Sequence, residues 1–144
     1  MKNLITLAAL LLCITFATAQ TNLKSIFKND DTTQLKDYLK NHNVNDCISA
    51  SQSDYNLLSL AIKYDANKVF EALVSSKEID LDNICEDKTP LMYAVKYGRE
   101  KMFKKLLSKG ADANKKSKRG RTAYEYALKH EQDSIAHILK ELKR

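Results

Sequence analysis

The same pattern of apolar residues recurs every 33 positions along most of this chain of 144 residues. The sets in this register include Ala61, Ala94 and Ala127, and Leu73, Leu106 and Leu139. A weaker copy, offset by 34, places Leu23, Phe27 and Leu39 in the positions of Leu57, Ala61 and Leu73. A fixed period of this length is typical of repeat proteins, in which similar units stack side by side.

Within a unit the apolar spacing is helical. Leu91, Ala94 and Val95 stand at i, i+3 and i+4, and a second run of the same kind begins at Met102 after a polar break at residues 96–100. One such unit cannot bury its apolar faces alone, whereas stacked neighbours can. We therefore expect an all-α solenoid of about four helix–turn–helix units.

Cap residues mark the ends of these helices in the third unit. Thr89 is a suitable N-cap, and Pro90 suits the first helical position, where its missing N–H costs nothing. Gly110 suits a left-handed cap after the second helix. Three glycines and one proline in the whole chain argue against a sandwich, a barrel or a glycine-cradled nucleotide fold.

The repeat resembles the ankyrin repeat. Thr89-Pro90-Leu91-Met92-Tyr93-Ala94 is similar to its T-P-L-H-x-A signature, with Met92 in the place of His. Gly110-Ala111-Asp112-Ala113-Asn114 is similar to its G-A-D-V-N ending. The resemblance implies an ankyrin-repeat solenoid with units at approximately 22–50, 54–86, 87–119 and 120–144. No unit carries the motif's His, which in the family makes hydrogen bonds to neighbouring loops.

The end units are more polar than the central ones. Lys140 stands where the preceding units have Val74 and Leu107. Polar outer faces keep a solenoid soluble, so we expect the array to be complete.

The first nineteen residues have the layout of a secretory signal peptide. A positive start at Lys2 is followed by an apolar run from Leu4 to Phe16 and by a small-x-small site that ends at Ala19. We expect cleavage there, export to a periplasm or the cell exterior, and one domain at residues 20–144. An uncleaved anchor would be short for a membrane span, and a lipoprotein signal at Cys13 would need a smaller residue than Leu12.

Two cysteines remain after this predicted cleavage, Cys47 and Cys85. Both fall in loops that leave a unit, and equivalent points on packed helices lie about 8–10 Å apart. A disulfide needs Cα atoms within about 7 Å. The spacing favours free thiols, with a disulfide as the alternative.

The chain lacks the residue patterns of known catalytic or metal sites. His42, His130 and His137 show no paired ligand spacing with each other or with the cysteines. Asp133, Ser134 and His137 are neighbours on one expected helix, which does not give a convergent hydrolase triad. We expect no cofactor, no metal and no enzymatic activity.

The resemblance also implies a partner-binding surface, the concave face made of the loop tips and the last turns of the first helices. Carried over by motif, it comprises Tyr55, Lys63, Tyr64, Lys88, Lys96, Tyr97, Lys118, Arg119, Arg121, Lys129 and His130. Within it, Lys63, Lys96 and Lys129 form one 33-residue series, and Tyr64, Tyr97 and His130 form another. Rigid aromatics beside cations are frequent at protein interfaces.

The formal net charge of +6 and the basic loop Lys115–Arg121 suggest an acidic protein partner. We expect a monomeric interaction module, without nucleic acid as a partner and without an integral membrane segment after signal cleavage. Three alternatives remain. The first is an immunity or inhibitor protein that neutralises a toxin or enzyme, and the second is an envelope protein that binds polymer or anionic lipid through its charge. The third is a hydrolytic or redox enzyme with a hidden site, the redox form of which would use Cys47 or Cys85.

Overall fold

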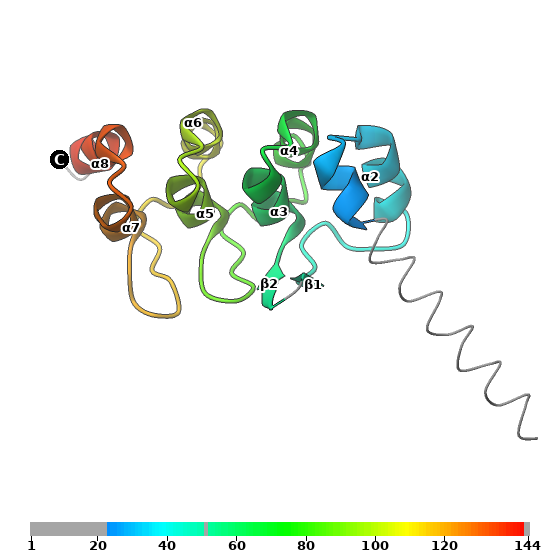
Figure 1. Cartoon of the computed structure of the whole chain (residues 1–144), viewed down its shortest axis with the longest axis horizontal. Helices are drawn as coiled ribbons and strands as arrows, with labels where there is room; N and C mark the ends of the chain where they lie inside the picture. The colour runs from blue at the N-terminus through cyan, green and yellow to red at the C-terminus, as the bar shows by residue number, and fades with distance from the viewer. Residues whose placement is uncertain (1–22, 51, 143–144) are drawn as a thin grey trace, which may run out of the picture.

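The computed structural model describes residues 23–50 and 52–142. The predicted signal peptide, residues 1–19, lies outside this part of the chain. In the described residues the helices come in pairs, which follow one another in a row (Figure 1).

The first pair consists of a helical segment at residues 23–28 and α2 (Thr32–Leu39). The other pairs are α3 (Leu57–Tyr64) with α4 (Asn67–Val74), α5 (Pro90–Lys96) with α6 (Glu100–Ser108), and α7 (Ala123–Lys129) with α8 (Asp133–Glu141). The first helices α3, α5 and α7 form one layer, and α4, α6 and α8 form a second layer (Figure 1). The predicted helix–turn–helix units and their stacking are confirmed.

A short β-hairpin interrupts the helical chain between the first and second pairs. β1 (Ile48–Ala50) runs antiparallel to β2 (Ser53–Tyr55), with Ile48 opposite Tyr55. The sequence predicted only an extended loop here, so the chain is not purely helical. The hairpin brings Tyr55 to the start of α3.

The first helix of each of the last three pairs begins at the same repeat position. Asn56, Thr89 and Thr122 are the N-caps of α3, α5 and α7, and their side chains accept hydrogen bonds from backbone N–H groups in the first turn. Thr122 also forms a reciprocal capping box with Glu125. The caps predicted at Thr89 and Pro90 are confirmed.

A residue in the left-handed conformation follows the first helix of every pair. These residues are Asp30 (φ 50°), Asp65 (φ 57°), Gly98 (φ 63°) and Glu131 (φ 54°). The Asp30 carboxylate accepts hydrogen bonds from the N–H groups of Lys68 and Val69, at 2.9 and 2.8 Å, in the first turn of α4. The first unit therefore caps a helix of the second unit, which fixes their relative position.

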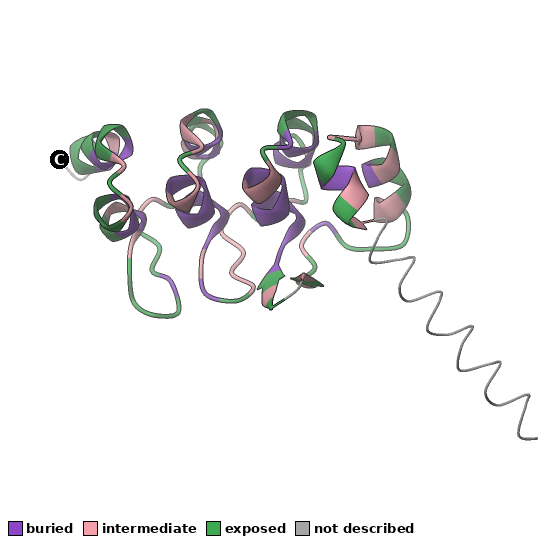
Figure 2. Ribbon diagram, in the orientation of Figure 1, coloured by how far each residue is buried: buried purple, intermediate pink, exposed green. Residues whose placement is uncertain are grey.

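The core follows the 33-residue register. The alanines of the register, Ala61, Ala94 and Ala127, are fully buried. The leucines of the register are at most 2% exposed, and they are Leu73, Leu106 and Leu139. Figure 2 shows the buried residues concentrated in α3, α5 and the inward faces of the second layer. Leu128 holds the register position of two buried residues but is 57% exposed, because no described helix pair lies beyond α7 and α8.

Asparagine side chains tie the adjacent loops of the first and second units together. The Asn45 side chain donates to the Glu78 carbonyl and accepts from the Asp80 N–H, both at 2.8 Å. Asn83 donates to the Asn45 carbonyl at 2.6 Å, and Asn56 donates to the Asn83 carbonyl at 2.8 Å. These bonds join neighbouring loops without the motif's histidine.

Candidate functional site

Three predicted lysines lie at the ends of three neighbouring helices. Lys63, Lys96 and Lys129 occupy the last turns of α3, α5 and α7. Because α3 contacts α5 and α5 contacts α7, these side chains step across the array once per unit. We call them the lysine row.

An aromatic residue follows each of these lysines. Tyr64, Tyr97 and His130 are each half-buried, and we call them the aromatic row. The ring of Tyr64 stacks on Phe27, at a centroid distance of 6.3 Å. The Lys96 ammonium lies 5.2 Å from the centroid of the Tyr97 ring. Cations and rigid rings therefore alternate on the exposed ends of the first-layer helices.

Two buried tyrosines support the aromatic row. Tyr93 stacks on Tyr97 and Tyr126 stacks on His130, each pair with centroids 6.3 Å apart. Sequence reasoning missed Tyr93 and Tyr126 as part of this surface. They are 33 residues apart and each lies four residues before its partner, a spacing that places two side chains on one helix face. That combination is the signal that identifies them.

The surroundings of His130 favour the neutral form of its imidazole. Burial lowers the pKa of its imidazole below the ordinary value, and the positive charges of Lys129, Lys96 and Lys88 lower it further. Burial also raises the pKa of Tyr97 to about 12, with contributions from Tyr55 and Tyr64. Both shifts favour the uncharged forms of the His130 and Tyr97 rings, which lie beside the lysine row.

Tyr55 lies deeper than a loop-tip contact would require, since only 6% of it is exposed. Its ring packs 5.3 Å from that of Tyr93. The Lys63 ammonium donates to the Tyr55 hydroxyl at 3.2 Å and lies 4.3 Å from its ring centroid. Tyr97 also interacts electrostatically with Tyr55, which contributes to the raised pKa of Tyr97. Tyr55 therefore interacts with one member of each row.

A buried carboxylate, Asp87, joins the third and fourth units. It pairs with Lys88 at 3.2 Å and accepts hydrogen bonds from the Tyr126 hydroxyl at 3.0 Å and the Arg119 N–H at 3.1 Å. Burial raises the pKa of Asp87, but the bonds from Lys88 and Tyr126 outweigh it and hold that pKa below its ordinary value. Lys88 and Arg119, predicted as partner contacts, thus also serve the fold.

Asp87→Asn is expected to lower the free energy of unfolding at pH 7 by about 1–3 kcal/mol. The neutral amide loses the ion pair with Lys88 and cannot accept all the hydrogen bonds that the carboxylate accepts. The pKa of Asp87 is lower in the folded than in the unfolded chain. Its stabilisation is therefore complete above the unfolded pKa of about 3.9 and is lost as pH falls through the folded pKa.

Urea unfolding of wild type and variant at pH 7, 5 and 3 measures this effect. The difference between them should shrink at the lowest pH, and a constant difference would contradict the assignment. Asp37→Asn is the matched control: its side chain is 69% exposed and paired with an exposed Lys40, so a change below about 0.5 kcal/mol is expected.

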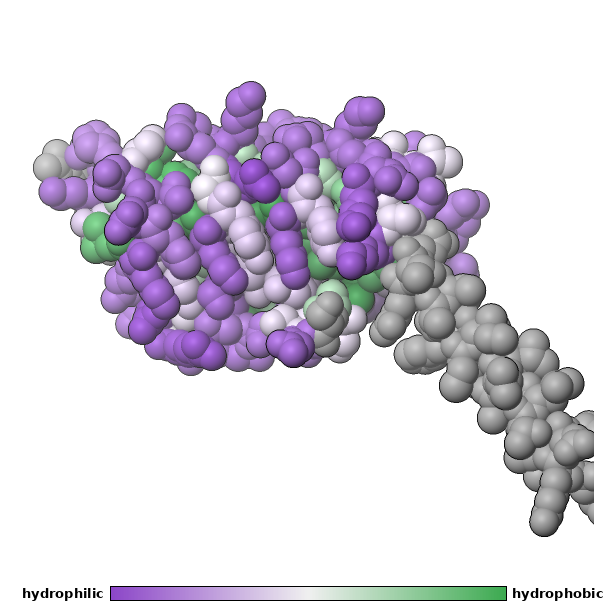
Figure 3. All heavy atoms as spheres, viewed as in Figure 1, coloured by the Kyte–Doolittle hydropathy of each residue, from purple (hydrophilic) through white to green (hydrophobic). Residues whose placement is uncertain are grey.

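Some polar groups of the basic loop Lys115–Arg121 form hydrogen bonds within the protein, although its charged side chains are exposed. The Lys118 ammonium donates to the Cys85 carbonyl at 3.0 Å, and the Arg121 N–H donates to the Ser117 hydroxyl at 3.2 Å. The side chains of Lys118, Arg119 and Arg121 remain exposed. Figure 3 shows a largely hydrophilic surface in which less polar side chains are interspersed, without one broad hydrophobic area on that face.

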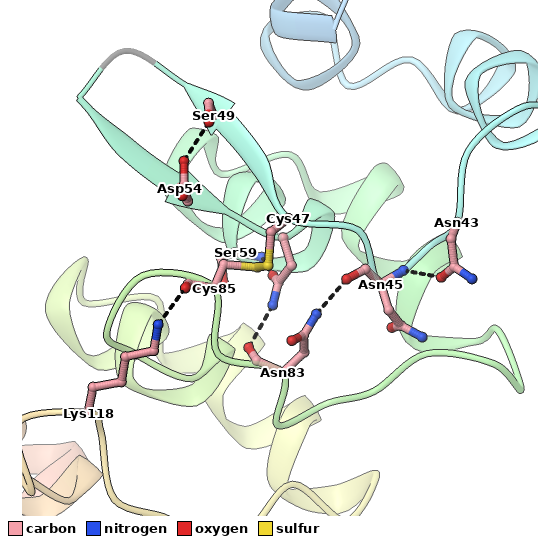
Figure 4. The surroundings of a disulfide bond; sticks show 10 residues. Asn43, Asn45, Cys47, Ser49, Asp54, Ser59, Asn83, Cys85 and Lys118 are labelled. Carbon is pink, nitrogen blue, oxygen red and sulfur yellow. Dashed lines mark hydrogen bonds between the residues drawn. A yellow bond between two sulfur atoms is a disulfide. The ribbon is translucent and has the colours of Figure 1, made fainter.

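The two cysteines form a disulfide, which corrects the expectation of free thiols. The Cα atoms of Cys47 and Cys85 are 5.4 Å apart, within the range that a disulfide spans. The expectation used the spacing of packed helices, but the loops approach more closely because Asn45 and Asn83 bond them directly (Figure 4). An Asn precedes each cysteine by two residues, at the same separation of 38 as the cysteines themselves.

The described residues do not gather into a recognisable catalytic or metal site. Over residues 23–50 and 52–142, no cluster of His, Cys, Asp and Glu could hold a metal ion. Asp133, Ser134 and His137 lie exposed on α8. In the same part of the chain, no helix combines the length and the apolar character needed to cross a bilayer.

Comparison with known proteins agrees with the repeat architecture. A family model for ankyrin repeats in three copies matches residues 23–117 and 58–143. The curated proteins contain no significant match to the chain.

Proposed function

The chain belongs to the ankyrin-repeat family, and from this premise we propose that it is an exported, monomeric binding module for one protein partner. Ankyrin repeats typically mediate protein–protein interactions and are generally not enzymes. The observation that carries the proposal is the pair of parallel rows on α3, α5 and α7, in which each of the last three units presents one cation beside one supported ring.

The physical properties of this surface suit protein recognition. Its rings rest on other rings, so binding orders few additional side chains and the entropic cost is limited. Its cations favour an acidic partner, whose approach they would accelerate. In such a complex the protein would sequester, inhibit or protect its partner, and an immunity protein would be one such inhibitor.

The disulfide supports the proposed export. Disulfides persist in oxidising compartments such as the periplasm and the cell exterior, and they are rare in a reducing cytosol. The Cys47–Cys85 bond joins two loops that are already hydrogen-bonded to each other, as expected for a structural crosslink. It therefore agrees with the signal-peptide layout of residues 1–19.

Tyr64→Ala and Tyr97→Ala are each expected to weaken partner binding by more than about 1 kcal/mol, roughly fivefold or more, as interface anchors do. The partner is first isolated from the native periplasmic or secreted fraction with a C-terminally tagged chain, beside a triple variant Tyr64→Ala, Lys96→Ala, Tyr97→Ala. Affinities of the single variants are then measured by calorimetry.

One stoichiometric protein captured by wild type and lost in the triple variant would support the proposal. Leu128→Ala is the control, because it removes an exposed apolar side chain outside both rows. Wild-type affinity in both single tyrosine variants would refute the assigned surface. Capture of anionic polymer that salt removes equally from all baits would instead favour an envelope polymer-binding protein, for which the exposed basic loop is the supporting observation.

A further inference from the structure

We infer that the lysine row and the aromatic row together recognise a segment of the partner in the polyproline II conformation, with an acidic side chain at every third position. The inference rests on the proposed function, and it specifies the chemistry and conformation of the segment that the surface binds.

The repeat distance of the rows selects the conformation of the segment. Each of the last three units contributes one lysine and one ring, and neighbouring packed helices lie about 8–10 Å apart. A polyproline II segment has three residues per turn and rises about 3.1 Å per residue, so equivalent side chains recur about every 9 Å. In a β-strand they recur about every 7 Å, and in an α-helix about every 5.4 Å. Only the first of these periods matches one step per unit.

The chemistry of the two rows selects the side chains. Tyr64, Tyr97 and His130 present ring surfaces of the kind on which proline-rich segments pack. The adjacent lysines present one cation per step, which matches one carboxylate per turn of the segment. Asp87 does not compete for these cations from within the protein, because it is buried and already paired with Lys88.

Internal contacts hold two of the three lysines close to the rings. Tyr55 accepts a hydrogen bond from Lys63, and the Lys96 ammonium lies 5.2 Å from the Tyr97 ring centroid. Each lysine also sits at a helix C-terminus, where a cation is favourable in any case. If the lysines only stabilised their helices, or attracted acidic ligands only through general charge, the affinity for a ligand would not depend on the spacing of its carboxylates. Spacing is therefore the property to test.

The probe is a fluorescent peptide of four Glu-Pro-Pro triplets, whose binding to the purified chain is followed by fluorescence anisotropy. Two control peptides keep the length: one has the same composition with its glutamates contiguous at one end, and the other has Gln in place of every Glu. We expect the spaced peptide to bind roughly fivefold or more tightly than either control, because several weak exposed ion pairs act in register.

Two matched triple variants locate the site. Lys63→Gln, Lys96→Gln, Lys129→Gln should reduce binding of the spaced peptide to the level of the Gln control. Lys68→Gln, Lys101→Gln, Lys109→Gln removes the same charge from exposed positions outside the rows and should leave binding unchanged. Circular dichroism of both variants checks that each remains folded.

Equal affinity for the spaced and contiguous peptides, an equal loss in both variants, or no saturable binding of the spaced peptide would overturn the inference. If the spaced peptide fails while the tagged chain still captures a partner that the Tyr64, Lys96 and Tyr97 triple variant loses, the proposed function stands and only this inference is wrong. If that capture fails as well, the proposed function is lost with it.

Discussion

Replacing both Cys47 and Cys85 by serine is expected to lower the free energy of unfolding by about 4 kcal/mol. The bond closes a loop with a sequence separation of 38 residues, and the chain-entropy relation for a loop of that length gives about this value. The loss acts mainly on the unfolded chain, which gains conformations that the crosslink excludes. It is large beside the roughly 5–15 kcal/mol that stabilises a typical domain.

Urea unfolding followed by circular dichroism at pH 7 measures this change. The matched control is chemical: a reductant should destabilise the wild type by a similar amount and leave the double variant unaffected. A difference below about 1 kcal/mol between oxidised wild type and the variant would show that the crosslink does not constrain the unfolded chain as described.

Leu106→Ala is expected to destabilise the fold by about 2–5 kcal/mol. Leu106 is fully buried on α6, in the register position that Leu73 and Leu139 occupy in the neighbouring units. Removal of its side chain leaves a cavity between close-packed neighbours, so the lost transfer energy and the lost contacts add together. In a solenoid each unit is stabilised by its neighbours, so damage at a central unit weakens the contacts on both of its sides.

Leu128→Ala provides the matched control, since it makes the same chemical change at a side chain that is 57% exposed. A change within about 0.5 kcal/mol is expected there. Equal destabilisation by the two substitutions would mean that the assigned burial of Leu106 and Leu128 is wrong. Both are measured by urea unfolding with the disulfide intact.

Much of the candidate surface could be predicted because it follows the period of the fold. The lysine row and the aromatic row repeat every 33 residues, so the stacking that aligns buried Ala61 and Ala94 also aligns the exposed Lys63 and Lys96. Tyr93 and Tyr126 have the same period, but they lie within apolar runs that we interpreted only as core. Their contacts with Tyr97 and His130 were therefore missed.

Contacts between loops could not be predicted in this way. Asp87 accepts a hydrogen bond from Tyr126 of the fourth unit, and a hairpin that has no counterpart in the third unit places Tyr55 beneath the surface. The Cys47–Cys85 bond is the clearest case, since the expected separation of the cysteines came from helix spacing. The loops lie closer than the helices because backbone groups of one accept bonds from asparagines of the other.

The helix pairs, the caps of the third unit, the stacking into an ankyrin-repeat array and the two rows on its surface could all be predicted from the sequence alone. These features depend on spacing along the chain, and stacking of similar units converts that spacing directly into contacts. The pairing of the cysteines, the burial of Tyr55 and the partners of Asp87 became known only from the three-dimensional structure. Those depend on the paths of irregular loops in space, and no period in the sequence specifies such paths.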